Sequence, residues 1–218
     1  DGLKDLLLVT MTEYEKDLSA LAAFPPLEIN APLSRIISDG GFRQLHIAES
    51  EKYAHVTYFF NGYQEKPFEN EYRILIPSKN MASHDLAPEM MAREISTRVT
   101  SAIEEGGFDF LLANFANTDM VAHTGNFDAA IQAIMAVDAE IKNIMDTCLA
   151  HDVALVITSD HGNVEEMIDP FTGRIETKHN PSPVPFYLVG KQFMRMKNDF
   201  DAQNIEQEVS GLLADVAP

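Results

Sequence analysis

The feature that most constrains the fold is an uncharged run near the middle of the chain, residues 153–158. Its residues are mostly β-branched or aliphatic, as expected for a strand buried on both faces of a parallel sheet. The run ends abruptly at Asp160 and His161, and Gly162 then lets the backbone turn without a Cβ in its path. Because ligands gather beyond the carboxyl ends of parallel strands, this junction predicts a metal site. A turn that merely caps a strand is the alternative explanation.

Strand-like and helix-like patterns alternate along the chain, without internal repeats. Apolar runs predict strands at residues 6–10, 44–49, 55–60, 73–76, 108–115, 153–158 and 184–189. Helical spacing and Gly stop signals predict helices at residues 33–39, 88–105, 128–151 and 205–216. This alternation predicts one α/β domain over residues 1–218, a three-layer α/β/α sandwich with a mostly parallel sheet. The buried stripe of the longest helix is expected to include Ile131, Ile134, Met135, Val137, Ile141, Ile144, Met145 and Leu149.

The balance of charge argues against one class of partner, nucleic acid. The chain has 16 basic and 34 acidic side chains, a formal net charge of -18. This balance disfavours a nucleic-acid surface, which needs clustered Lys and Arg. It is compatible with a phosphorylated substrate, since bound divalent metals bring their own local positive charge.

The single cysteine, Cys148, excludes an intramolecular disulfide framework and fits a reducing compartment. No apolar run has the length needed to span a membrane, and no signal peptide is recognisable. We therefore expect a cytoplasmic protein without membrane contacts. Because the chain does not begin with Met, we also expect it to be a processed or truncated piece of a longer protein.

Two other stretches resemble the central junction in their chemistry. Asp119 and His123 follow the predicted strand 108–115 and are four residues apart, so a helical turn would place both on one face, where they could share a metal. The third stretch, residues 178–185, contains three prolines that hold His179 on a stiff loop.

Taken singly, each of these residues has an ordinary explanation as a surface Asp, a loop His or a polar pair. Together they supply two carboxylates and three imidazoles, mostly at predicted carboxyl ends of strands. Carboxylate and imidazole ligands suit Zn²⁺ or Mn²⁺ better than Ca²⁺. One tetrahedral catalytic ion needs fewer ligands, and two ions about 3.5–4 Å apart need more. We therefore predict a two-metal site with part of its ligand set missing, formed by Asp119, His123, Asp160, His161 and His179.

Four segments of the sequence resemble the 2,3-bisphosphoglycerate-independent (cofactor-independent) phosphoglycerate mutases, which belong to the alkaline phosphatase superfamily. These segments are residues 46–62, 114–125, 158–163 and 179–185. The resemblance runs from residue 7 to about residue 189, and the first two segments are specific to the family rather than the superfamily. It implies an alkaline-phosphatase-like fold for a metal-binding, phosphatase-type domain.

The resemblance also implies a division of the five ligands between two ions. Asp119, His123 and His179 would bind one ion, and Asp160 and His161 the second. Mn²⁺ is the expected metal, with Zn²⁺ and Co²⁺ as alternatives.

Lys52 matches a lysine that contacts the phosphoryl group in the family. The implied activity is that of a glycolytic and gluconeogenic isomerase, which interconverts 3-phosphoglycerate and 2-phosphoglycerate through a phosphoserine intermediate. This assignment agrees with the physics, because phosphoryl transfer depends mainly on positioning and charge neutralisation.

The sequence also departs from the family pattern. Family members are longer, and their serine nucleophile and a further Asp ligand lie in an amino-terminal segment that has no match here. A substrate-binding domain whose arginines hold the glycerate is likewise unmatched. No serine of this chain fits the nucleophile motif, and Ser159 belongs to the predicted strand. We therefore expect this chain to supply most metal ligands and Lys52, and to be inactive alone.

The expected partners are phosphoglycerate and the amino-terminal part of the same enzyme, which would be a monomer at full length. Two alternatives remain open. One is another enzyme of the superfamily, such as a phosphatase, a phosphodiesterase or a phosphopentomutase. The other is a non-catalytic binding domain that has kept the fold.

Overall fold

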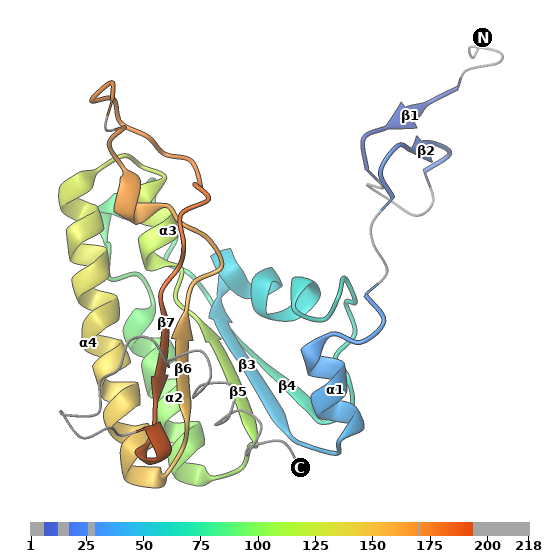
Figure 1. Ribbon diagram of the computed structural model, residues 1–218, viewed down its shortest axis with the longest axis vertical. Coiled ribbons are helices and arrows are strands. Elements are labelled where there is room, and N and C mark those ends of the chain that lie inside the picture. The colour runs from blue at the N-terminus through green and yellow to red at the C-terminus, as the bar shows by residue number, and fades with distance from the viewer. Residues whose placement is uncertain (1–6, 13–17, 26–28, 170, 194–218) are drawn as a thin grey trace, which may run out of the picture. The chain divides into compact units, whose positions relative to one another are not determined.

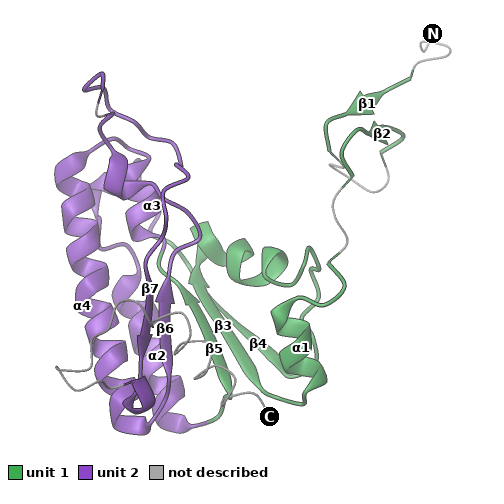
Figure 2. Cartoon of the chain, viewed as in Figure 1, with its two compact units in different colours: residues 1–78, 107–115 green, residues 79–106, 116–218 purple. Residues whose placement is uncertain are grey.

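The computed structural model describes residues 7–12, 18–25, 29–169 and 171–193 (Figure 1). The chain forms two compact units (Figure 2). Unit 1 comprises residues 1–78 and 107–115, and unit 2 comprises residues 79–106 and 116–218. The predicted helix at residues 205–216 lies outside the described residues.

The α-helices and strands alternate in the order expected for an α/β protein. The helices are α1 (Leu33–Asp39), α2 (Ala92–Glu105), α3 (Asn117–Ala122) and α4 (Phe127–His151). The strands are β1 (Val9–Thr10), β2 (Leu21–Ala22), β3 (Gln44–Glu49), β4 (Glu71–Ile76), β5 (Phe110–Asn114), β6 (Leu155–Thr158) and β7 (Phe186–Val189). The predicted helix at residues 88–105 begins only at Ala92, because residues 88–91 form a turn in which Met90 has a φ of 40°.

Unit 1 is built around β3, which pairs in parallel with β4 on one side and with β5 on the other. Every residue of β3 is buried. Leu45, Ile47 and Ala48 supply its apolar contacts, and the strand ends at the buried carboxylate of Glu49. A fully buried central strand is the pattern expected of a parallel sheet.

The prediction of a strand at residues 55–60 is wrong, because His55–Phe59 form a π-helical turn. The β-branched and aromatic residues of this segment favour a strand locally, but tertiary contacts prevail. Val56 is buried and its carbonyl accepts a hydrogen bond from His46 Nδ1 at 2.6 Å. Phe60, just beyond the turn, stacks on Phe110 of β5 with ring centroids 6.3 Å apart.

The predicted buried strand at residues 6–10 is also corrected. Only Val9 and Thr10 form a strand, which pairs in parallel with the two residues of β2. Leu7 and Val9 are largely exposed. Two paired residues on each strand are too few to bury an apolar face.

Unit 2 contains α2, α3 and α4, and α4 packs against both of the others. The face of α4 that meets α3 is lined with alanines, and Val121 and Ala122 of α3 lie in the same core cluster. The predicted buried stripe of α4 is correct for Ile144, which is buried, and wrong for Ile131, Ile134 and Met135, which are exposed. Small side chains let helices approach closely, so Ala129, Ala130 and Ala133, and not the neighbouring bulky residues, form the packed face in the amino-terminal half of α4.

The residues of the uncharged run form β6, which pairs with β7 in an antiparallel manner. Within the described residues it is not buried on both faces, because Val156 is 52% exposed. The relative direction of β6 and β7 depends on the path of the chain through residues 159–185. The composition of the uncharged run does not determine that path. The other strand pairs are parallel, so the predicted α/β class with a mostly parallel sheet is confirmed. None of the described helices combines the length and apolar character required to cross a membrane.

Candidate metal centre

The short helix α3 places Asp119 and His123 on one face. The backbone N–H of His123 donates to the carbonyl of Asp119 at 3.1 Å, which closes a helical turn between them. Their side chains meet as expected for an i, i+4 pair, with 3.1 Å between His123 Nε2 and Asp119 Oδ1. The loop after residue 115 thus enters the helical turn that a shared metal site at Asp119 and His123 requires.

His179 joins this pair from a loop far along the chain. Its Nε2 atom lies 3.1 Å from Asp119 Oδ1 and 3.1 Å from His123 Nε2. The three ligand atoms thus form a nearly equilateral triangle. Ligand atoms about 2.0–2.2 Å from a shared ion, at angles of about 90–110°, are separated by about 2.8–3.6 Å. The triangle has the size that a common divalent ion requires.

A backbone carbonyl orients the ring of His123. The Nδ1 atom lies 2.6 Å from the carbonyl oxygen of Thr177, to which it donates a hydrogen bond. In a neutral imidazole this bond leaves Nε2 without a proton, so its lone pair faces Asp119 and His179. Sequence reasoning missed the role of Thr177, because a carbonyl acceptor carries no signature in residue type.

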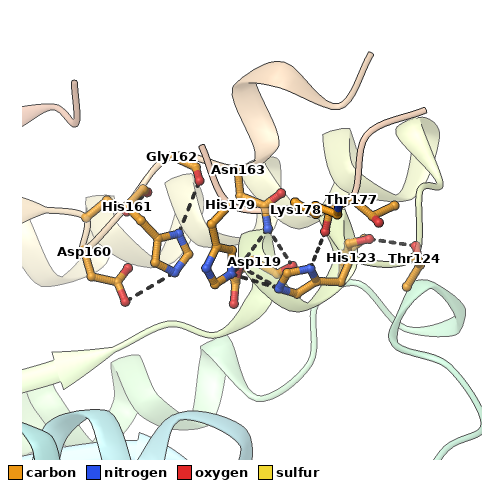
Figure 3. A network of polar contacts seen from close by, with 12 residues as sticks. Asp119, His123, Thr124, Asp160, His161, Gly162, Asn163, Thr177, Lys178 and His179 are labelled. Carbon is orange, nitrogen blue, oxygen red and sulfur yellow. Dashed lines mark hydrogen bonds and ion pairs between the residues drawn. The ribbon is translucent and has the colours of Figure 1, made fainter. Parts of the chain in front are cut away.

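Asp160 and His161 lie beside the triangle (Figure 3). The His161 ring stacks on the His179 ring with centroids 3.6 Å apart. His161 Nε2 and Asp160 Oδ2 lie 3.5 Å apart, so these two side chains form a second group of candidate ligands next to the first. All five predicted residues therefore gather in one region of unit 2.

The close approach of two loops brings these groups together. The backbone N–H of Asn180 donates to the carbonyl of Gly162 at 2.9 Å, which forms an isolated antiparallel bridge. A Cβ atom at Gly162 would overlap Asn180 Oδ1 and Glu165 Oε1. Glycine therefore leaves room at this position for the Asn180 and Glu165 side chains, and no positive φ calls for it.

Glu165 anchors the same loop. Its Oε2 atom accepts a hydrogen bond from the backbone N–H of Asn163 at 2.8 Å. Partial burial acts to raise the pKa of the Glu165 carboxyl, but hydrogen bonds from the backbone N–H groups of Glu165 and Asn163 outweigh it and lower the pKa below its ordinary value.

Comparison with known proteins agrees with this geometry. A model of the Metalloenzyme superfamily matches residues 17–218. The chain belongs to this superfamily. Enzymes named 2,3-bisphosphoglycerate-independent phosphoglycerate mutase from Chloroflexus aurantiacus and Pseudomonas putida are each 46% identical to it, over 99% and 96% of this chain. The resemblance noted in the sequence is confirmed.

A solved structure supports the assignment of the fold. The crystal structure of Leishmania mexicana phosphoglycerate mutase at low cobalt concentration matches 88% of this chain with a TM-score of 0.77 and 27% identity. The matched region is 38% of that protein, and the chain spans 39% of the length of the Chloroflexus and Pseudomonas relatives. The alkaline-phosphatase-like, Metalloenzyme fold predicted from the sequence is confirmed.

The donor set of this superfamily member fits a divalent ion. Two imidazole nitrogens and one carboxylate oxygen converge in the triangle, a combination that suits Zn²⁺, Mn²⁺ or Co²⁺. In the neutral tautomer with the proton on Nδ1, the Nε2 atom of His123 offers a lone pair toward the centre of the triangle. A cation held in the triangle would accept this lone pair and one from Nε2 of His179 in its matching tautomer.

Lys52 lies in unit 1, in the short turn Ser50–Lys52 that follows β3. It is only 6% exposed. In the same region, the carboxylate of Glu49 accepts a hydrogen bond from the Ser78 hydroxyl at 2.9 Å. A buried lysine just beyond the carboxyl end of a parallel strand is where an anion-binding side chain is expected.

Proposed function

We propose that this chain is the metal-binding part of a 2,3-bisphosphoglycerate-independent phosphoglycerate mutase. The reaction would be the interconversion of 3-phosphoglycerate and 2-phosphoglycerate. The observation that carries the proposal is the convergence of Asp119, His123 and His179 within a chain that is 46% identical to enzymes of that name. Asp160 and His161 are proposed ligands of a second ion.

Each residue has a role that its surroundings support. Asp119, His123 and His179 would hold the first ion through the atoms that already face one another. When bound, two divalent ions would neutralise charge on the phosphoryl group. Mn²⁺ is the proposed metal, with Zn²⁺ and Co²⁺ as alternatives. Lys52 would contact the phosphoryl group as a fixed positive charge.

The phosphoryl-accepting serine and the residues that hold the glycerate are proposed to come from other parts of the same enzyme. The proposed partners of this chain are accordingly a small phosphorylated substrate and the remainder of that polypeptide. This proposal accounts for a set of five ligands, which is smaller than two ions need.

Activity of the full-length protein that contains this sequence tests the proposal. We expect turnover of 3-phosphoglycerate without added 2,3-bisphosphoglycerate, loss of activity with a chelator, and recovery on addition of Mn²⁺. Lys52→Ala should lower kcat/KM by about 100-fold or more, as removal of a group that stabilises developing charge typically does. The matched control is Lys66→Ala, which alters an exposed lysine of the same unit.

Two results would overturn the proposal. If generic phosphoesters are hydrolysed faster than 3-phosphoglycerate by orders of magnitude, the protein is a phosphatase of the superfamily. If the purified protein takes up neither Mn²⁺ nor Zn²⁺, and Asp160→Ala changes no property, it is a non-catalytic domain with this fold.

A further inference from the structure

The side chain of Asn163 connects the loop after β6 to the candidate ligand on α3. Its Nδ2 atom lies 2.7 Å from Asp119 Oδ1 and 3.5 Å from the Asp119 carbonyl oxygen (Figure 3). Both neighbours are acceptors, so the amide N–H group, and not the amide oxygen, must face Asp119. Asn163 is only 4% exposed, so water competes little for this hydrogen bond.

The carboxylate oxygen that Asn163 contacts is the one that faces the two imidazoles. Asp119 Oδ1 lies 3.1 Å from Nε2 of both His123 and His179. A carboxylate oxygen offers two lone-pair directions. The N–H of Asn163 occupies one of them and leaves the other for an ion in the triangle. The hydrogen bond therefore selects which Asp119 oxygen is presented as a ligand.

The other contacts of Asn163 hold the amide in place. Its backbone N–H donates to Glu165 Oε2, so the residue is fixed from its main chain as well. The Oδ1 atom of Asn163 makes no hydrogen bond to any residue within the described ranges. The hydrogen bonds of this side chain thus go to Asp119 alone, which indicates a dedicated partner rather than membership of a wider polar network.

We infer that Asn163 is a positioning residue, which holds Asp119 Oδ1 in the orientation that binds a divalent ion. This inference rests on the proposed metal site. Because Asn163 follows Asp160, His161 and Gly162 directly in the chain, the same hydrogen bond also sets the loop after β6 against α3. Partners that orient metal ligands in this way typically contribute about 10–100-fold to metal affinity.

Metal titration of the full-length protein tests the inference. Asn163→Leu has a similar volume but no donor, and Asn163→Ala removes the donor with a smaller side chain. The matched control is Asn143→Leu, because Asn143 Nδ2 donates to Glu140 Oε2 at 3.1 Å on an exposed face of α4. Affinities for Mn²⁺ are measured by calorimetry at a temperature where circular dichroism shows every variant to be folded. The visible absorption of bound Co²⁺ reports the ligand geometry.

We expect both Asn163 variants to bind one Mn²⁺ about 10–100-fold more weakly and to show an altered Co²⁺ spectrum, with the control unchanged. A purely structural role would lower thermal stability and leave the Co²⁺ spectrum as it is. Mn²⁺ affinity within twofold of the unsubstituted protein, together with an unchanged spectrum, would overturn the inference and leave the metal site standing. If the unsubstituted protein binds no metal, the proposed function and this inference both fail.

Discussion

The imidazole rings of His161 and His179 stack with their centroids 3.6 Å apart and their planes inclined by 20°. The two residues belong to different loops, and the stack joins the second candidate ligand group to the first. The ring of His161 can therefore act both as a ligand and as a packing surface for His179.

These two roles can be separated by substitution. His161→Phe keeps an aromatic ring against His179 but removes the nitrogen ligands, so we expect the protein to bind one Mn²⁺ instead of two. His161→Ala removes the ring as well and should also weaken the remaining site, by roughly tenfold, since the supporting contact is lost. Metal content by elemental analysis and affinity by calorimetry provide the measurement. Retention of two ions by His161→Phe would contradict the assignment of His161 as a ligand.

Gly162 permits the contact between the two ligand-bearing loops. In Gly162→Ala the added methyl group would meet Asn180 Oδ1 and Glu165 Oε1, so these two side chains would have to move from the hydrogen bonds they make to Ser182 and Asn163. We expect a loss of about 1–3 kcal/mol in the free energy of unfolding and weaker Mn²⁺ binding. The control is Gly107→Ala, where the nearest atom to the new Cβ is 3.8 Å away. If Gly162→Ala and Gly107→Ala lower the free energy of unfolding and the Mn²⁺ affinity equally, the contact between Gly162 and Asn180 contributes no more to the site than an ordinary surface position.

The buried carboxylate of Glu71 organises the interior of unit 1. It accepts hydrogen bonds from Arg73 Nε at 2.6 Å, from Asn61 Nδ2 at 2.7 Å and from the backbone N–H of Phe68 at 2.9 Å. Glu71→Gln would leave the Arg73 guanidinium without its counter-charge, so we expect unfolding to be easier by about 3–5 kcal/mol. Denaturant titration measures this change.

An exposed ion pair supplies the comparison for Glu71. Asp146 pairs with Lys142 on the surface of α4, where both side chains are more than half exposed. Asp146→Asn should change stability by less than about 1 kcal/mol. A loss of similar size in both variants would show that burial does not strengthen the Glu71 network.

Burial of Cys148 on α4 raises the pKa of its thiol above the ordinary value. The thiolate is the reactive form, so the folded protein should react slowly with a disulfide reagent at pH 8 and rapidly in guanidinium chloride. The unfolded chain releases this proton more readily than the folded one. The thiol's contribution to stability is therefore present at neutral pH and is lost as the pH rises through and beyond the ordinary thiol value of about 8.5.

Cys148→Ala removes this source of pH dependence and serves as the reference. The difference between the unfolding free energies of the two proteins should be constant near pH 7, where it reflects only the smaller side chain, and should change toward pH 10. Rapid labelling of the folded protein would show instead that the thiol is accessible.

Much of the candidate site could be predicted from residue type and spacing. Asp119 and His123 are four residues apart, and a single helical turn is enough to bring such a pair together. Asp160 and His161 are adjacent, so their proximity needs no tertiary structure. The tertiary structure had to bring three segments together: α3, the loop after β6 with Asp160 and His161, and the loop that carries His179. Recognition of His179 rested on the chemistry of imidazole and on the stiffness of its proline-rich loop.

The errors occurred where local pattern and tertiary packing disagree. The segment at residues 55–60 favours a strand by propensity, but the hydrogen bond from His46 to the Val56 carbonyl helps to hold it in a helical turn. In the amino-terminal half of α4 the large residues Ile131, Ile134 and Met135 are exposed, because close contact with α3 is made by alanines instead. The central run correctly indicates a strand, but the path of the chain through residues 159–185 decides its antiparallel pairing with β7.

The sequence by itself determined the class of fold, the family and the identity of the five candidate ligands, because these depend on residue chemistry and short-range periodicity. Only the tertiary structure decided which nitrogen of His123 faces the site, how closely Gly162 meets Asn180, and that Asn163 holds Asp119. These features depend on contacts between segments far apart in the chain. Backbone carbonyls and small residues make several of those contacts, and such groups leave no pattern in the order of the amino acids.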